Sequence, residues 1–148
     1  MQFFKRKLLY PPKSKKGESH PFDSIYKSYR RHLESLQPKL SERAWKLACL
    51  SFHDARVSSV VRPNKQTLTI TLDQPGYDVV RGGWLAARST TLEFSGVKKE
   101  WVPQTIVGDV WLYEEINLSD LAAFDYQVLL WKDEIRIQAD DIHISMGS

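Results

Sequence analysis

The sequence is poor in cysteine and has no long apolar run. Cys49 is the only cysteine among the 148 residues, which excludes an intramolecular disulfide and favours a reducing compartment. No apolar stretch approaches the roughly 18 residues that cross a bilayer. The basic residues near the start are not followed by the hydrophobic region of a signal peptide. We therefore expect a cytoplasmic protein that does not enter a membrane.

Common catalytic signatures are missing as well. There is no glycine-rich phosphate loop, no His-Glu-x-x-His, no cysteine pair and no Gly-x-Ser-x-Gly, which argues against most nucleotide hydrolases, zinc proteases and serine hydrolases. The acidic pairs Asp133-Glu134 and Asp140-Asp141 lack the spaced ligand series of a calcium loop. We predict neither a metal nor a cofactor.

What is present suits one soluble globular domain over residues 1–148, because 42% of the residues are apolar and 26% are charged. The charge is divided unevenly along the chain. Residues 1–62 hold 14 Lys and Arg against 5 Asp and Glu, a net +9, whereas residues 63–148 hold 7 against 13, a net −6. The basic half could attract an anionic partner. It could equally be the outside of helices that complement an acidic sheet.

The first third of the chain predicts a helical part over residues 22–52, after a partly mobile segment over residues 1–21. Steps of three and four separate a set of apolar residues that form one helical stripe: Phe22, Ile25, Tyr29, Leu33 and Leu36. Gln37-Pro38 predicts the end of this helix. Ser41 is a suitable N-cap for a second helix, whose apolar set is Ala44, Trp45, Leu47, Ala48 and Phe52.

From residue 53 to residue 146 the apolar period becomes two, which is typical of strands. Leu68, Ile70 and Leu72 alternate with threonines, and similar alternation recurs up to Ile144. The parity of the isoleucines changes at Asp140-Asp141, which predicts a bulge. Successive strands without intervening helices indicate an antiparallel arrangement. We expect an α+β fold in which an N-terminal helical hairpin packs on an antiparallel meander sheet of five to six strands.

His53, Asp54 and Arg56 form the densest group of chemically capable side chains. A histidine exchanges protons near neutral pH, and an adjacent carboxylate can fix its tautomer. Consecutive residues of a strand point to opposite faces, so His53 and Asp54 need not touch, whereas Asp54 and Arg56 share a face and could pair. The alternative is structural: Asp54 and Arg56 tie the helical part to the first strand, and His53 fills the joint.

Glu114 is the second candidate. It has the inward parity of Leu112 and Ile116, and Trp111, Tyr113 and Glu115 have the opposite parity. A buried carboxylate is costly unless it is paired or protonated. We therefore expect a partner for Glu114 such as Arg56, His53 or a water. Together His53, Asp54, Arg56 and Glu114 are the candidate polar pocket, and an internal ion pair or a water-facing edge position is the structural alternative.

The stretch Phe52-His-Asp-Ala-Arg56, followed by Thr67-Leu-Thr-Ile-Thr-Leu-Asp73, resembles an uncharacterised bacterial family of unknown function. Its members join a helical N-terminal part to a Leu-His-Asp-Ala-Arg motif and then to alternating strands. Later blocks, such as Trp111-Leu-Tyr-Glu-Glu115, are similar too. The resemblance covers roughly residues 20–145 and implies the fold, but it brings no established activity.

Three functions follow, in order of preference. The first is a small binding or protein-interaction module without catalytic activity, whose protein partner could be masked by charge complementarity as in an immunity protein. The second is an enzyme or small-ligand binder that uses the polar pocket of His53, Asp54, Arg56 and Glu114. The third, and least favoured, is nucleic-acid binding through the basic N-terminal half.

Overall fold

The computed structural model describes residues 1–6 and 21–147. The expected mobile segment over residues 1–21 therefore lies largely outside the described residues. The helical elements are α1 (Pro21–Leu36), the 3₁₀ turn η2 (Gln37–Lys39), α2 (Glu42–Ala48) and the 3₁₀ turn η3 (Gln104–Ile106). The strands are β1 (Leu50–Ser51), β2 (Val57–Asn64), β3 (Thr67–Leu72), β4 (Tyr77–Asp78), β5 (Ser89–Ser95), β6 (Lys99–Trp101), β7 (Trp111–Asn117), β8 (Phe124–Leu130), β9 (Glu134–Ala139) and β10 (Asp141–Gly147).

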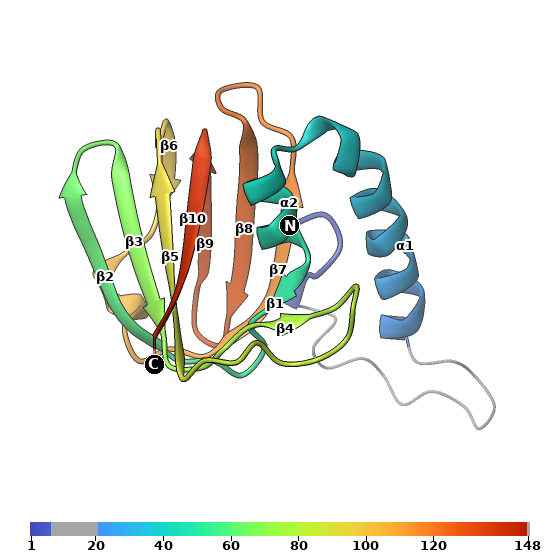
Figure 1. Cartoon of the computed structure of the whole chain (residues 1–148), viewed down its shortest axis with the longest axis horizontal. Helices are drawn as coiled ribbons and strands as arrows, with labels where there is room; N and C mark the ends of the chain where they lie inside the picture. Colours follow the sequence, from blue (N-terminus) through green and yellow to red (C-terminus); the bar gives the residue numbers. More distant parts are fainter. Residues whose placement is uncertain (7–20, 148) are drawn as a thin grey trace.

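The strands form three antiparallel sheets (Figure 1). Two have four strands each, in the orders β10-β5-β3-β2 and β6-β9-β8-β7, and the third pairs only β1 with β4. Phe94 from the first large sheet contacts Phe124 and Tyr126 from the second, with ring centroids 6.3 and 5.8 Å apart. The core therefore lies between the two large sheets, as in a β-sandwich. The predicted α+β class is confirmed, but the prediction of a single meander sheet is wrong.

Two continuous stretches of chain pass from one large sheet into the other. β5 leads through Gly96 into β6, and β9 leads through Asp140 into β10. The two corners meet, since the Asp140 N–H donates to the Ser95 carbonyl at 3.1 Å. Ile142 is fully buried after this corner, as Ile137 is before it. The parity change that predicted a bulge thus marks a change of sheet, which lets both isoleucines face the core.

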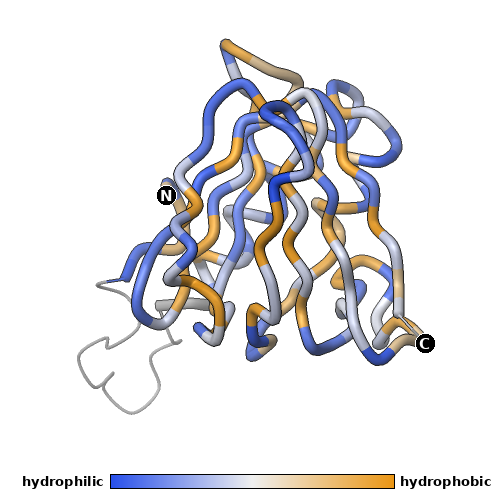
Figure 2. Tube along the Cα trace, turned by 90° about the vertical axis from the view of Figure 1, so that its left-hand side faces the viewer, coloured by the Kyte–Doolittle hydropathy of each residue, from blue (hydrophilic) through white to orange (hydrophobic). Residues whose placement is uncertain are grey.

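Side-chain alternation follows the strands as predicted. In β3 the buried positions are Leu68, Ile70 and Leu72, and hydrophobic and hydrophilic segments succeed one another along the chain (Figure 2). Such alternation gives each sheet one face toward the core and one toward solvent. Among the residues that the structure describes, no helix combines the length and the apolar character needed to cross a membrane.

The helices lie at one end of the sheets (Figure 1), and each has its own contacts. α1 runs beside β7, the last strand of its sheet, where the Tyr29 hydroxyl accepts the Ile116 N–H at 3.0 Å. His32 Nε2 lies 3.1 Å from the Ile116 carbonyl. These two side chains satisfy the outward N–H and carbonyl of Ile116 on the free edge of β7, where another strand could otherwise pair. α2 packs against β10 instead, and the predicted hairpin of two helices on one sheet face is not observed.

The apolar stripe of α1 and the N-cap of α2 agree with the sequence, but the predicted helical part up to residue 52 is too long: α2 ends at Ala48, and Phe52 follows strand β1, which pairs with β4. Leu33 and Leu36 are buried, Tyr29 is half-buried, and the Ser41 hydroxyl caps α2 by accepting the Ala44 N–H at 3.1 Å. A helix of seven residues has little stability of its own, so this cap and the packing of Leu47 hold it in place.

The chain between α2 and β2 is bound to the start of β7. The Asp54 N–H donates to the Trp111 carbonyl, and the Trp111 N–H donates to the Ala55 carbonyl, both at 2.8 Å. Phe52 and Ala55 are fully buried at this junction. The residues before β2 are therefore held against β7, which brings β1 and β7 to the same side of α1.

Candidate binding pocket between α1 and β7

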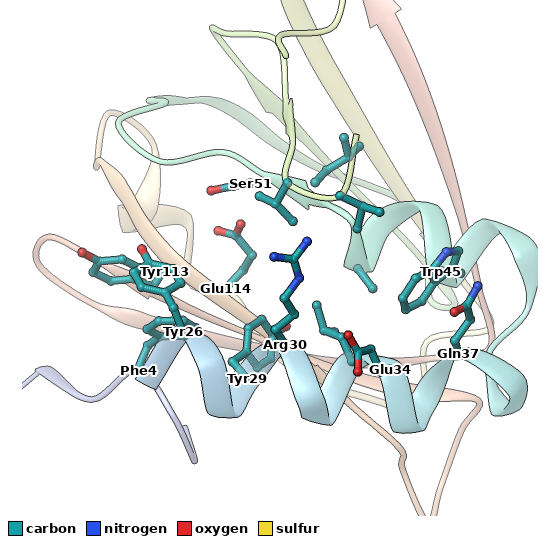
Figure 3. A pocket seen from close by; sticks show the side chains of 15 residues that line it. Phe4, Tyr26, Tyr29, Arg30, Glu34, Gln37, Trp45, Ser51, Tyr113 and Glu114 are labelled. Carbon is teal, nitrogen blue, oxygen red and sulfur yellow. The ribbon is translucent and has the colours of Figure 1, made fainter. Parts of the chain in front are cut away.

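A pocket of about 410 Å³ opens between α1 and the β1 and β7 strands (Figure 3). Its walls are mostly apolar or aromatic, with a few polar groups. The lining residues from α1 and η2 are Tyr26, Tyr29, Arg30, Leu33, Glu34 and Gln37; the others are Phe4, Trp45, Ala48, Leu50, Ser51, Val79, Val80, Tyr113 and Glu114. This volume and this composition are typical of small-molecule sites.

Glu114 is the acidic group in the wall formed by β7. Its Oε2 accepts the Trp111 indole N–H at 2.8 Å. The Ser51 side chain and the Phe52 backbone also hydrogen-bond to it. Burial raises the pKa of Glu114 to about 7, more than these hydrogen bonds lower it. The predicted partners Arg56 and His53 are not among these contacts, and three neutral donors of this chain take their place.

Trp111 reaches Glu114 because β7 is irregular at its start. The pairing of β7 with β8 shifts register between Trp111 and Tyr113, and such a bulge reverses the side-chain parity on one side of it. Trp111 is therefore fully buried and shares a face with Glu114, whereas simple alternation predicted opposite faces. The bulge was not visible in the sequence, because Trp111-Leu-Tyr-Glu-Glu115 contains no glycine to mark it.

Aromatic rings gather at one end of the pocket (Figure 3). Phe4 stacks on Tyr113 with ring centroids 4.9 Å apart and an interplanar angle of 8°, and it also contacts Tyr26 and Tyr29 at 5.3 Å each. A side-chain hydrogen bond joins Tyr26 and Tyr113. Burial is the main cause that raises the pKa of Tyr26, Tyr29 and Tyr113, and the Glu114 charge raises each of these pKa values further. The phenols therefore stay neutral at any physiological pH.

Phe4 is positioned by the next acidic residue of β7. The Glu115 side chain is fully buried on the opposite face from Glu114, and it accepts the backbone N–H groups of Gln2, Phe3 and Phe4 at 2.9, 2.6 and 2.5 Å. Three donors on one buried carboxylate fix the start of the chain against β7. Glu115 was not predicted to have a role, and its parity alone made it look like a solvent-facing residue.

His53 and Asp54 lie together beside the pocket, outside its lining. The His53 Nδ1 lies 2.6 Å from the Leu112 carbonyl and therefore carries a proton; Nε2 lies 3.5 Å from Asp54 Oδ1. Asp54 adopts φ 70°, a left-handed turn conformation, so the strand rule that would separate the two side chains does not apply. The His53 ring contacts the Tyr113 ring, with centroids 5.2 Å apart, which is its link to the pocket.

Arg56 is directed away from Glu114. Its guanidinium donates to the Gly108 carbonyl at 3.2 Å, and its backbone N–H donates to Asp73 Oδ1 at 2.8 Å. Asp54, the pairing partner that an extended segment would supply, is not among these contacts. Of the four predicted residues, Glu114 alone lines the pocket, while Arg56 connects the start of β2 to the loop before β7.

Several pocket residues were not predicted. Arg30 extends from α1 into the pocket (Figure 3), yet the helical pattern assigned it to the solvent side. It has no ion pair or hydrogen bond with any residue that the structure describes. Tyr26 and Tyr29, three residues apart on α1, were the available signal, because two tyrosines one turn apart bring two polar tips to one side of a helix.

The described residues contain no group of three or more His, Cys, Asp or Glu that could hold a metal ion. The polar groups that line the pocket are the carboxylates of Glu34 and Glu114, the guanidinium of Arg30, and amide and hydroxyl groups, set in a mostly apolar wall. Such a set can bind and orient a small molecule.

Comparison with known proteins places the chain in a family. No curated protein and no solved structure matches the chain. A family model matches residues 13–134, which confirms the resemblance to an uncharacterised family of unknown function. Because this match spans most of the sequence, the chain belongs to the family described as Protein of unknown function (DUF4085).

Proposed function

We propose that this protein is a binding module whose ligand is a small organic molecule held in the pocket between α1 and β7. The observation that carries the proposal is the pocket itself: about 410 Å³, lined by apolar and aromatic side chains, with Glu114 in its wall. Enclosure by apolar surface supplies affinity, and a few convergent polar groups supply orientation. Of the sequence-based hypotheses, this is the small-ligand binder, with Glu114 retained from the predicted polar residues.

Two features support a site built to accept a ligand. The carboxylate of Glu114 is held by Trp111, Ser51 and Phe52, so its direction is set before any ligand arrives, which reduces the ordering cost of binding. Arg30 has no partner in the described residues although it lines the same pocket. His53 and Asp54 would act only through the Tyr113 ring, and Arg56 would have no part in the site.

The test is a titration of the ¹⁵N-labelled protein with 2-phenylethanol, a neutral aromatic probe, followed by NMR. Shifts are expected at pocket residues such as Ser51, Val79 and Glu114. Val80→Trp fills the pocket from its exposed rim and should abolish these shifts. Val61→Trp is the matched control, since Val61 has a similar exposed fraction, 51% against 52%, but lies on β2 outside the pocket. Shifts that persist in Val80→Trp, or no shifts in the wild type, would contradict the proposal.

The other functions stay predictions from the sequence. A protein partner bound in the manner of an immunity protein, and nucleic-acid binding by the basic half, each call for a macromolecular surface, and the pocket favours neither. The bacterial origin and the cytoplasmic location likewise stay predictions.

A further inference from the structure

Among the residues that the structure describes, no cationic side chain pairs with the carboxylate of Glu114. All three of its hydrogen-bond donors are neutral groups: the Trp111 indole, the Ser51 side chain and the Phe52 backbone. None of the ion pairs among the described residues includes Glu114. A carboxylate offers about four acceptor positions, so three donors leave one for a group in the pocket. Buried charges are normally paired, and no residue in the described part of the chain supplies the opposite charge.

The aromatic end of the pocket suits a positive charge as well. Phe4, Tyr26, Tyr29 and Tyr113 line it together with Glu114. Aromatic faces carry negative electrostatic potential, which attracts ammonium groups. The Tyr126 hydroxyl, which is fully buried and not part of the lining, has no hydrogen-bond partner among the described residues, and the Glu114 charge raises its pKa also. The charge of Glu114 therefore raises the pKa of four tyrosines.

We propose that the ligand of this pocket is an organic amine with an apolar or aromatic body, whose ammonium group binds Glu114 among the tyrosine rings. The inference rests on the proposed function and adds the chemical class of the ligand. The ammonium would occupy the free acceptor position of the carboxylate in a charge-assisted hydrogen bond. The apolar body would lie against the other end of the pocket, formed by Leu33, Trp45, Leu50 and Val79.

Arg30 defines the alternative that must be distinguished. Its exposed, unpaired guanidinium would favour a carboxylate-bearing ligand. Arg30 lines the pocket but is an exposed residue, whereas Glu114 is partly buried by its surroundings. The charge of Arg30 is not among the causes that shift the pKa of Glu114, so Arg30 does not neutralise this carboxylate.

The pH dependence of binding supplies an independent readout. An alkyl ammonium stays charged through pH 8, whereas Glu114, with a pKa of about 7, gains its charge between pH 6 and pH 8. Amine affinity should therefore rise over this range. The other titratable or charged groups that line the pocket are Arg30, Glu34, Tyr26, Tyr29 and Tyr113. Glu115, Cys49 and Asp54 act on these tyrosines from outside the lining, and Glu114 acts on Tyr126. The lining residues of β1 and of the segment after β4 are the uncharged Leu50, Ser51, Val79 and Val80.

The experiment compares three probes of similar shape by NMR titration of the full chain: 2-phenylethylamine, 2-phenylethanol and 3-phenylpropionate. At pH 8 the amine should bind about tenfold more tightly than the alcohol. Glu114→Gln should bring the amine to within about threefold of the alcohol and remove the rise in amine affinity between pH 6 and pH 8. Glu93→Gln, on an exposed position of β5 away from the pocket, should change neither.

Each other outcome overturns a definite claim. Equal affinity for the three probes would overturn the amine assignment and leave the proposed pocket function standing, since the alcohol still binds. Tightest binding of 3-phenylpropionate, lost in Arg30→Gln, would replace the amine with a carboxylate. No binding of any probe would overturn the proposed function itself. Retained alcohol binding in Glu114→Gln shows that this variant is folded, so its loss of amine affinity can be read directly.

Discussion

Glu114 and Glu115 are neighbours on β7, yet their carboxylates lie on opposite faces and have different donors. Glu115 accepts three backbone N–H groups of the N-terminal segment, whereas Glu114 accepts two side-chain donors and one from the backbone. Glu115 therefore holds the N-terminal segment against β7, whereas Glu114 faces the pocket. At the residue scale, this division separates a structural acid from a candidate binding acid.

The pKa of Glu114 predicts a pH-dependent stability. Its value of about 7 in the folded chain lies above the ordinary 4.5. Between these values the folded state holds a proton that the unfolded state has released, so this group lowers the free energy of unfolding as pH rises from 4.5 to 7. The full effect is on the order of 3 kcal/mol above pH 7.

The measurement is urea unfolding of wild type and Glu114→Gln at intervals from pH 4.5 to pH 8. As pH rises, the free energy of unfolding of the wild type should fall relative to that of Glu114→Gln, because glutamine does not titrate. Glu134→Gln, at an exposed position on β9, should leave the wild-type pH profile unchanged. Parallel profiles for Glu114→Gln and wild type would show that Glu114 is ionised throughout.

At the scale of elements, α1 acts as a cover for the edge of β7. Its Tyr29 hydroxyl accepts the N–H of Ile116, a residue with no exposed surface, and its His32 ring lies at the carbonyl of the same residue. One helical turn separates Tyr29 from His32, which is the spacing that lets both side chains reach one strand residue. The contact also positions the α1 wall of the pocket.

Tyr29→Phe should lower the free energy of unfolding by about 1–3 kcal/mol, because it leaves the buried Ile116 N–H without an acceptor. Tyr77→Phe is the control, since the Tyr77 side chain is exposed and its hydroxyl has no hydrogen bond with the described residues. Chemical denaturation of both variants makes the comparison. A Tyr29→Phe variant as stable as the control would mean that apolar contacts alone hold α1 on the sheet.

At the scale of the whole molecule, the fold depends on the corner where two stretches of chain change sheets. Gly96 has φ 60°, and a Cβ built there would lie 2.8 Å from the Cβ of Asp140 in the facing corner. Glycine is needed here for two reasons: the left-handed conformation and the close approach of the second chain stretch. Gly108 has φ 88° but no atom within 4 Å of such a Cβ.

This pair of glycines isolates the cost of crowding at the corner. Gly108→Ala should cost about 1 kcal/mol from backbone conformation alone. Gly96→Ala should cost roughly 2–4 kcal/mol, because the overlap with Asp140 adds to the same backbone term. Both free energies of unfolding can be measured by denaturation. Equal costs for the two variants would show that the corner opens without penalty.

The helix and strand positions could be predicted because they depend on spacing along the chain. Leu33 and Leu36 lie on the buried stripe of α1, and Leu68, Ile70 and Leu72 on the buried face of β3, as the periods of the sequence indicate. The Ser41 cap followed from its side chain alone. Glu114 could be singled out as a carboxylate at an apolar position.

The assembly of these elements could not be predicted, because it depends on contacts between distant residues. The bulge that turns Trp111 toward Glu114 arises where β7 pairs with β8. The left-handed conformation of Asp54, which brings its side chain near His53, is held by hydrogen bonds to β7. The sequence contains no information on the distance between Arg56 and Glu114. In the structure, Arg56 donates to Gly108 and Asp73 and does not line the pocket.

The sequence by itself determined the positions of the two helices and of the longer strands, since local periodicity and capping decide how much apolar surface each can bury; the short strands β1, β4 and β6 have too few residues to show a period. Only the tertiary structure decided that the strands divide into separate sheets and that a pocket opens beside Glu114. The physical reason is that a pocket is the space that remains when α1, β1 and β7 pack together, and its shape depends on their relative positions and not on the pattern within any one of them.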